Sequence, residues 1–479
     1  MKYISYTRQQ NKIELPLICS CLSAPRHMPE PRNSILISTI NRAEGATIMT
    51  ISRRNFLQAT AAGGALLGTS VLAGCSASKT GAVTAKDRNL EIFSWWTSGG
   101  EVQALDALYS VYRKQYPGVK IANAAIGGAS GGTNMQAVLQ SRMLGNQPPD
   151  SFQGHPGAEF IDSWVKTGAM EPLDKLYKDE GYAKVLPAAL IEMSSWQGKP
   201  YSVAVNAQRS NLTLYNKTLM KKVGGTVPTT WDEFFTLADK AKAMGIPAIG
   251  LAESGGNATQ CVVEKLLLAK LGPDGYKGLF NGKTDWGSQG VTAALETAAR
   301  CFAYANPNYL SVIGSDEPSL VSSGQALLIL NGDWCIGGFE AKNFTDYGWA
   351  PAPDTDGMFI LNSDSFGLPK GAPNPTPALD WLKVVGSKEG QDAFNPPKGT
   401  ISPRSDRDDS HYNAYQHWAV NQWETAKVFL PTITDGSATS TQFTTAWANA
   451  MQSFDVNKDP ALTQAALVKA AQSDKNISS

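Results

Sequence analysis

Two groups of residues in this sequence have types and spacings that could support chemistry. The first is Gly128-Ala129-Ser130-Gly131-Gly132, which satisfies the G-x-S-x-G pattern of a hydrolase nucleophile elbow. An elbow places its serine at a tight turn directly before a helix, whereas Ser130 lies inside a longer glycine-rich run, 127–133. We therefore expect a flexible loop here and keep a lipoprotein esterase that uses Ser130 only as an alternative function.

The second group consists of tryptophans with polar neighbours. Trp95-Trp96 ends a predicted strand, Trp334 follows Asn331-Gly332-Asp333, and Asp364 lies in a run of small polar residues. Neighbouring side chains of a strand point to opposite faces, so one of the paired indoles can be core while the other faces a cleft. We expect Trp96 in the cleft, because ligands of parallel sheets bind outside the carboxyl ends of strands.

Such residues suit a sugar ligand. An indole can cover the apolar C–H face of a sugar, and burying about 50–100 Å² of that face contributes roughly 1–3 kcal/mol. Carboxylates and amides bind the rim of hydroxyls, and each charge-assisted hydrogen bond adds about 1.5–3 kcal/mol. A single tryptophan is as often part of the core, so only a cluster of these residues would make a sugar site.

No pattern typical of a metal, cofactor or disulfide site occurs after residue 75. The three cysteines there show no C-x-x-C spacing and cannot all pair, and no H-E-x-x-H motif occurs. We therefore expect no cofactor and no metal site. The residues concerned are Cys261, Cys301, Cys335, His155, His411 and His417.

The first 74 residues have the layout of an export signal. A twin arginine, Arg53-Arg54, precedes an uncharged run of small and apolar residues, 57–74, that is too short for a comfortable membrane span. The run ends in Leu72-Ala73-Gly74-Cys75, the pattern that a lipoprotein peptidase recognises. We expect residues 49–74 to be a Tat lipoprotein signal peptide and Cys75 to carry the lipid anchor.

Residues 1–48 precede Met49 and are expected to be non-translated or unstructured upstream sequence. The mature chain would then span 75–479, with a lipid-anchored tether over 75–88, and its length suits two domains. This part holds 34 Lys and Arg against 39 Asp and Glu, a net charge of about −5. A mildly acidic surface argues against nucleic acid as a partner.

Apolar spacing predicts the elements that must position these side chains. We expect strands over Leu90–Trp96 and Val119–Ile126, and helices over Val102–Tyr112 and Met135–Leu144. This order implies right-handed crossovers and a parallel sheet. Further helices are expected at Thr230-Trp231-Asp232-Glu233, capped by Thr229 or Thr230, and over 260–271, 291–304, 377–385 and the C-terminus. The chain is thus α/β, with more helix than strand.

The whole mature chain resembles the family 1 extracellular solute-binding proteins, and within them the bacterial glucose-binding proteins of ABC importers. The segments that carry the resemblance are Ile92-Phe93-Ser94-Trp95-Trp96, Arg142-Met143-Leu144-Gly145 with Pro148-Pro149-Asp150, Thr230 to Phe234, Gly332-Asp333-Trp334, Ser363 to Gly371, and Gly386 to Asp392 with Phe394-Asn395-Pro396.

The resemblance implies the two-lobed type II fold of periplasmic binding proteins. Each lobe is expected to be a sheet flanked by helices, and the lobes are joined by hinge crossovers near 203–206, 361–363 and 400–404. The N-terminal lobe would comprise 89–203 and 362–402. The C-terminal lobe would comprise 204–361 and 403–479.

The resemblance also implies the sugar contacts, of which Asp364 and Lys398 would bind adjacent hydroxyls and Trp334 would stack on the ring. Gln208 replaces a histidine common in glucose-binding relatives, and other departures near Gly314 and Thr432–Asp435 put glucose specificity in doubt. The implied contacts are Trp96, Glu101, Gln153, His155, Asn206, Gln208, Trp334, Asp364 and Lys398.

We therefore expect a non-enzymatic, extracytoplasmic, membrane-anchored monomer that captures a glucose-like monosaccharide or small glycoside and delivers it to an ABC permease. Its expected partners are the sugar, the permease subunits and, through Cys75, the membrane. The other alternative is a glycoside hydrolase, for which Glu101, Glu159 and Asp364 could supply two carboxylates.

Overall fold

Five strands from distant parts of the chain form the first sheet of the computed structural model, which describes residues 89–127 and 132–478. Their order is β2-β1-β3-β12-β6, with β1 parallel to both β2 and β3, and β12 antiparallel to β3 and β6. The parallel β1–β2 pair confirms the expected strand–helix–strand unit. The strands are β1 (Asn89–Ser94), β2 (Lys120–Ala125), β3 (Ser151–Gly154), β6 (Ser202–Ala204) and β12 (Ser365–Gly367).

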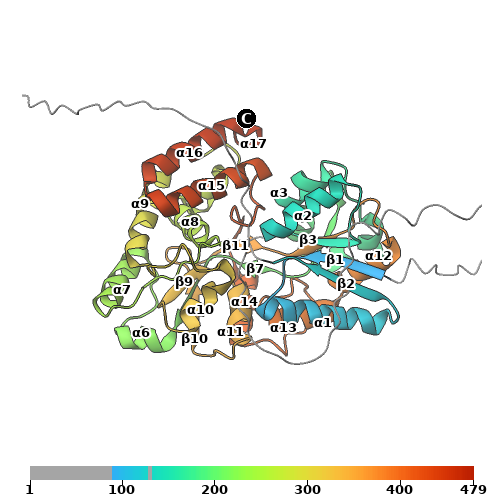
Figure 1. The fold of residues 1–479 in the computed structure, drawn as a ribbon, viewed down its shortest axis with the longest axis horizontal. Coiled ribbons are helices and arrows are strands. Elements are labelled where there is room, and N and C mark those ends of the chain that lie inside the picture. The colour runs from blue at the N-terminus through green and yellow to red at the C-terminus, as the bar shows by residue number, and fades with distance from the viewer. Residues whose placement is uncertain (1–88, 128–131, 479) are drawn as a thin grey trace, which may run out of the picture. The chain divides into compact units, whose positions relative to one another are not determined.

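Both faces of this sheet are buried, and the alternation along β1 shows how. Leu90 and Ile92 pack in a core cluster with residues of α1 and α12, whereas Phe93 packs on the other face with Met135 and Leu139 of α2. Helices therefore lie on either side of the strands (Figure 1). The helices of this region are α1 (Gly99–Gln115), α2 (Thr133–Leu144), α12 (Pro375–Gly386) and α13 (Lys388–Lys398).

The rest of the described chain is built on two three-stranded sheets. In one, β8 lies between β10 and β9 and is antiparallel to both; in the other, β11 lies between β13 and β7. These strands are β7 (Gln208–Arg209), β8 (Leu212–Asn216), β9 (Leu328–Asn331), β10 (Tyr347–Pro351), β11 (Met358–Asn362) and β13 (Val428–Pro431).

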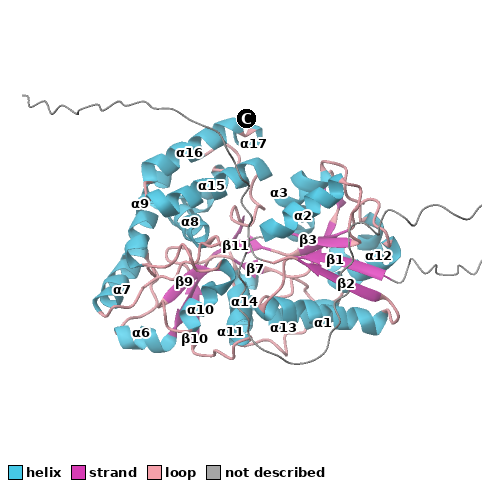
Figure 2. Cartoon of the chain, in the orientation of Figure 1, coloured by secondary structure: helices cyan, strands magenta, loops and turns pink. Residues whose placement is uncertain are grey.

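Helices surround these two sheets (Figure 2). The Thr230 side chain caps α7 by accepting a hydrogen bond from the Glu233 N–H, which confirms the helix start expected there. The helices are α6 (Lys217–Val223), α7 (Trp231–Ala243), α8 (Ala258–Gly278), α9 (Gln289–Cys301), α10 (Glu317–Ser322), α11 (Trp334–Glu340), α14 (Ala414–Thr425), α15 (Thr441–Asn457), α16 (Pro460–Ser473) and α17 (Lys475–Ser478).

Short elements complete the described part. They are α3 (Ala158–Phe160), the π-helical turn η3 (Ile161–Val165), α4 (Asp174–Asp179), α5 (Ala188–Met193), the hairpin β4 (Ser195–Trp196) with β5 (Lys199–Pro200), and the 3₁₀ turns η4 (Tyr182–Lys184), η5 (Phe302–Tyr304) and η6 (Gly314–Asp316).

The chain passes between the first sheet and the other two at neighbouring places. It leaves the first sheet after β6 and enters another at β7, and it returns between β11 and β12. A third segment runs beside them, because Ala207 and Ile401 form an antiparallel bridge. The lobe limits given above stay a prediction.

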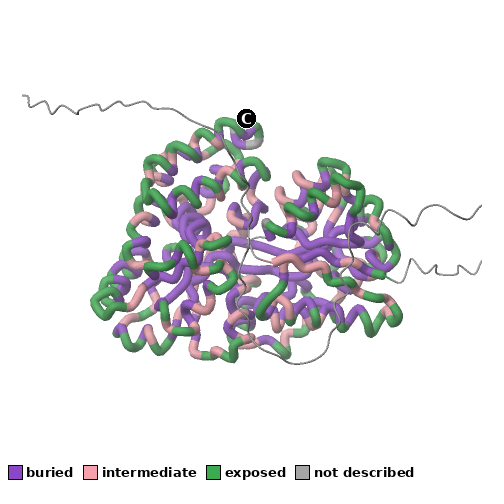
Figure 3. The backbone as a smooth tube through the Cα atoms, in the orientation of Figure 1, coloured by how far each residue is buried: buried purple, intermediate pink, exposed green. Residues whose placement is uncertain are grey.

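Buried residues concentrate along the strands and the inner faces of the helices (Figure 3). Cys261, Cys301 and Cys335 are buried and free of disulfides. Within 89–127 and 132–478, no helix combines the length and apolar character that a membrane span requires. The predicted signal peptide, the tether, the lipid attachment at Cys75 and the hydrolase serine Ser130 all lie outside the described residues.

Candidate ligand-binding site

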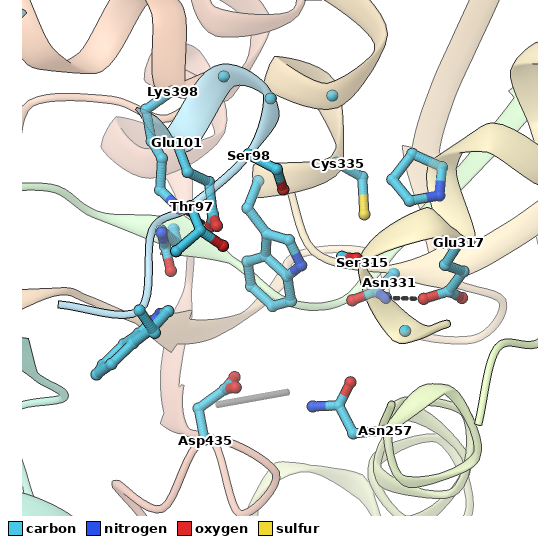
Figure 4. Close-up of a pocket in the computed structure, with 18 of the residues that line it drawn as sticks. Thr97, Ser98, Glu101, Asn257, Ser315, Glu317, Asn331, Cys335, Lys398 and Asp435 are labelled. Carbon is cyan, nitrogen blue, oxygen red and sulfur yellow. Dashed lines mark hydrogen bonds and ion pairs between the residues drawn. The ribbon is translucent and has the colours of Figure 1, made fainter. Parts of the chain in front are cut away.

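A cavity of about 200 Å³, here called the primary cavity, lies where the crossing segments meet the loop after β1 and the N-terminal end of α11. Polar side chains from several elements surround it (Figure 4). Six of the residues that the resemblance singled out line it. They are Glu101, His155, Gln208, Trp334, Asp364 and Lys398.

Asp364 is the most heavily hydrogen-bonded carboxylate of the primary cavity. Its Oδ1 accepts a hydrogen bond from Gln153 Nε2 at 2.8 Å, and its Oδ2 accepts from Asn206 Nδ2 and Gln208 Nε2, each at 2.8 Å. The residue is only 2% exposed. Gln153 and Asn206 do not line the cavity, so they contribute by orienting this carboxylate.

Lys398, at the end of α13, supplies a buried cation beside that carboxylate. Its Nζ donates a hydrogen bond to Glu101 Oε1 and lies 4.0 Å from Asp364 Oδ2. Burial by itself would lower the pKa of Lys398, but Glu101 and Asp364 outweigh it and raise that pKa. The ammonium is therefore charged, and it can still donate a hydrogen bond to a ligand.

His155 is a second cation in the primary cavity. Its Nδ1 lies 2.6 Å from Glu159 Oε2, and its Nε2 lies 3.8 Å from Asp364 Oδ1. Burial by itself lowers the pKa of His155, but Glu159 together with Asp435 and Asp364 raises it to about 9. The ring also packs against Trp95, with centroids 5.0 Å apart.

Trp334 opens α11 and presents a half-buried indole to the primary cavity. Its ring folds back over Gly332, where a Cβ would lie 2.1 Å from Trp334 Cζ3, so only glycine leaves room for this position. The intervening Asp333 accepts hydrogen bonds from the Arg209 N–H and the Tyr415 hydroxyl, each at 3.0 Å. These contacts hold the N-terminal end of α11 in place.

Trp96 does not line the primary cavity, contrary to our expectation; Trp95 lines it instead. Trp96 is fully buried in the core, with its ring centroid 5.8 Å from Phe366 and 5.1 Å from Phe394. Lys398 Nζ lies 5.1 Å from the centre of the Trp96 ring. Trp96 thus makes a cation–π contact with Lys398 and does not contact the ligand site itself.

The primary cavity also has polar lining residues that sequence reasoning did not select as ligand contacts. Asn257, Glu317, Asn331 and Asp435 all line the primary cavity (Figure 4). The Glu317 carboxylate accepts a hydrogen bond from Asn331 through Oε2, while Oε1 has no partner among the described residues. Burial raises the pKa of Glu317 to about 8. Only Asn331, close to Trp334 in sequence, could have been suspected from a motif.

The carboxylates suggested for a glycoside hydrolase are engaged by the protein itself. Glu101 accepts from Lys398, Glu159 from Gln136 and His155, and Asp364 from three amides. Such carboxylates suit hydrogen bonding to a ligand rather than protonation of a leaving group. The described residues contain no group of three or more His, Cys, Asp or Glu side chains that could hold a metal ion.

Comparison with known proteins places this geometry in context. The family described as "Bacterial extracellular solute-binding protein" matches residues 96–392. An uncharacterised ABC transporter extracellular-binding protein of Pyrococcus horikoshii is 33% identical over 82% of this chain and 89% of its own. A probable sugar-binding periplasmic protein of Mesorhizobium japonicum is also 33% identical, over 68% of this chain and 78% of its own.

Among solved structures, the bacterial solute receptor AcbH, described as having an exclusive substrate preference for β-D-galactopyranose, superposes with a TM-score of 0.71. The match covers 81% of this chain and 98% of AcbH at 20% identity, so it speaks to the fold alone. The two-lobed α/β fold expected from the sequence is thereby confirmed.

Proposed function

Because the chain belongs to the bacterial extracellular solute-binding proteins, we propose that it is the extracytoplasmic sugar-binding component of an ABC importer. Its curated relatives are binding proteins of transport systems and not enzymes. The names of several relatives mention sugars, which supports the same ligand class for this chain.

Aromatic faces and a charged hydrogen-bonding cluster meet in the primary cavity, and this combination supports a sugar ligand. The indoles of Trp95 and Trp334 can cover C–H faces of a ring, while Asp364 and Lys398 offer an acceptor and a donor side by side. Each apolar face that is covered and each charge-assisted hydrogen bond contributes roughly 1–3 kcal/mol. A few such contacts account for micromolar binding, for which about 8 kcal/mol is needed.

A neutral, monosaccharide-sized unit fits the primary cavity best. Its volume of about 200 Å³ lies below the roughly 300–1,000 Å³ of sites for drug-sized ligands. Both cations are already paired, Lys398 with Glu101 and His155 with Glu159, so neither offers a free charge to a phosphate or a uronate. We propose a glucose-like hexose as the unit that occupies it.

We also propose how the lobes move on binding and how the protein is held at the membrane. The N-terminal lobe (89–203 and 362–402) and the C-terminal lobe (204–361 and 403–479) would close around the sugar and present it to the permease. The twin-arginine signal and Cys75 support export and lipid anchoring at the membrane. A monomer is expected.

A thermal-shift screen over neutral hexoses, pentoses, amino sugars, sugar phosphates and uronates tests the ligand class. A ligand at 100 times its Kd stabilises the folded protein by about 2.7 kcal/mol. We expect stabilisation by at least one neutral hexose and none by the anionic sugars. Stabilisation by anionic sugars alone, or by no sugar at all, would overturn the proposal.

A further inference from the structure

A second cavity of about 340 Å³, here called the side chamber, adjoins the primary cavity. The two share four lining residues: His155, Gly255, Asn257 and Asp435. Its other walls come from α2, from the loop after β13 and from one face of α15. The side chamber is therefore a continuation of the primary cavity.

The junction between the two cavities is polar and open. Asn257 and Asp435 point toward one another across it in Figure 4, an amide facing a carboxylate. Asn257 directly precedes α8 without capping it through its side chain, and its Nδ2 group is a donor that a ligand can use. Gly255 contributes to the same place with φ at +64° and no side chain that could narrow the passage.

Amides and hydroxyls make up most of the polar side chains that line the side chamber. Thr434 and Thr444 line the chamber, and each carries a buried hydroxyl without a hydrogen-bond partner among the described residues. Asn449 and Gln452 are exposed on α15 and add further donors and acceptors. No aromatic side chain other than the His155 ring lines this chamber within the described residues.

The charges of the lining indicate which class of ligand the side chamber can bind. The charged side chains that line the side chamber, among the residues described, are His155, Glu159 and Asp435. His155 is paired with Glu159, so among the described residues no unpaired cation lines the chamber to bind an anionic ligand. The Asp435 carboxylate would also repel such a ligand. A phosphate or uronate is disfavoured, and a neutral group rich in hydroxyls is favoured.

We propose that the side chamber is a subsite for a second neutral glycosyl unit, linked to the sugar in the primary cavity. The ligand is then a disaccharide or a longer neutral glycoside, and the glycosidic bond passes between Asn257 and Asp435. This inference rests on the proposed function. The primary cavity alone is smaller than ordinary small-molecule sites, whereas the two cavities in series reach their usual size range of roughly 300–1,000 Å³.

The test compares the affinity of the full chain for a hexose that binds and for disaccharides carrying that hexose at one end, by titration calorimetry. We expect at least one disaccharide to bind at least tenfold more tightly than the hexose. The Ala448→Phe variant places a ring in the side chamber from α15, away from the primary cavity. It should leave hexose affinity unchanged and lower disaccharide affinity at least tenfold.

A matched variant, Ser453→Phe, adds the same ring at an exposed position of α15 that does not line the chamber, and should change neither affinity. If Ala448→Phe does not fold, the double variant Asn449→Ala with Gln452→Ala removes two exposed polar groups and should weaken disaccharide binding selectively. A hexose that binds as tightly as every disaccharide, with variants that change nothing, would overturn the subsite but leave the proposed function intact. Absence of any sugar binding would overturn both.

Discussion

Asn206 and Asp364 exchange two hydrogen bonds. Asn206 Nδ2 donates to Asp364 Oδ2 at 2.8 Å, and the Asp364 N–H donates to Asn206 Oδ1 at 2.7 Å. Asn206 lies between β6 and β7 and Asp364 between β11 and β12, so this exchange ties together the two segments that pass between the sheets. The carboxylate that we propose to bind the sugar is thus also part of the connection between the lobes.

Asp364→Ala should weaken sugar binding by about 10- to 100-fold, because a charge-assisted acceptor worth roughly 1.5–3 kcal/mol is lost. It should also lower the melting temperature without ligand, since Gln153, Asn206 and Gln208 lose their buried acceptor. Calorimetry and thermal unfolding measure the two effects. Asp106→Ala, at an exposed position of α1, serves as the control. Undiminished affinity in Asp364→Ala would remove this residue from the site.

Trp334→Ala should mainly weaken sugar binding, whereas Trp96→Ala should mainly lower folding stability. Trp334 is half-buried at the cavity, so its loss should weaken binding about tenfold or more and move the melting temperature little. Trp96 is fully buried, and its replacement by alanine should cost about 3–5 kcal/mol of folding stability. Equilibrium unfolding and calorimetry on both variants distinguish these roles. An equal loss of stability in the two would contradict the reassignment of Trp96.

The free energy of unfolding should fall as the pH rises from about 6.5 to 9, because His155 loses its stabilising proton over this range. The pKa of this residue is raised from 6.5 to about 9, so its stabilisation is complete below pH 6.5 and is lost as the pH passes 9. Glu317, whose pKa burial raises to about 8, adds a slope of the same sign up to about pH 8, whereas Asp435, whose pKa burial raises to about 6, adds one only below about pH 6. Denaturant unfolding of His155→Gln should therefore show a shallower decline. A wild-type slope in this variant would be the contrary result.

Ligand binding should decrease the radius of gyration, because the two proposed lobes would close around the sugar and contacts between them beside the site would hold the closed form. The Ala158 and Glu159 N–H groups donate to Ser437 O at 3.4 Å and Gly436 O at 2.9 Å. Gly157 permits this approach, with φ at +114° and a position where a Cβ would lie 2.8 Å from Ser437 Cβ.

The glycine variants give this prediction a matched control. Gly157→Ala should weaken sugar binding about tenfold and oppose the compaction seen by small-angle scattering. Gly118→Ala introduces a comparable strain, at φ +94°, where nothing lies within 4 Å, and should leave affinity unchanged. Identical scattering profiles of the wild type with and without saturating sugar would argue against closure.

Cys75→Ala should release the protein from membranes or block its processing. The prediction follows from Leu72-Ala73-Gly74-Cys75 after the twin arginine, since we propose that the side chain of this cysteine carries the lipid. Fractionation of cells followed by immunoblotting measures it. Ser76→Ala provides the neighbouring control, and an unchanged membrane fraction for Cys75→Ala would contradict the anchor.

Local sequence patterns determined much of the architecture. Apolar periodicity located β1, α1, β2 and α2, and their order implied the parallel pairing, because a crossover helix can return the chain only to a parallel strand. Motif resemblance named Trp334, Asp364 and Lys398, which do meet in the primary cavity. These signals survive in sequence because each depends on residues that are close together along the chain.

Tertiary structure alone decided which of Trp95 and Trp96 faces the cavity. Alternation states that neighbouring side chains point to opposite sides, but helices cover both faces of this sheet, so either side could be core. The positions of Glu317 and Asp435 in the primary cavity could not be predicted either, because these two residues lie more than a hundred positions apart in the sequence and burial, which raises the pKa of both carboxyls, exists only in the folded protein. No local pattern encodes a contact that exists only after the lobes have come together.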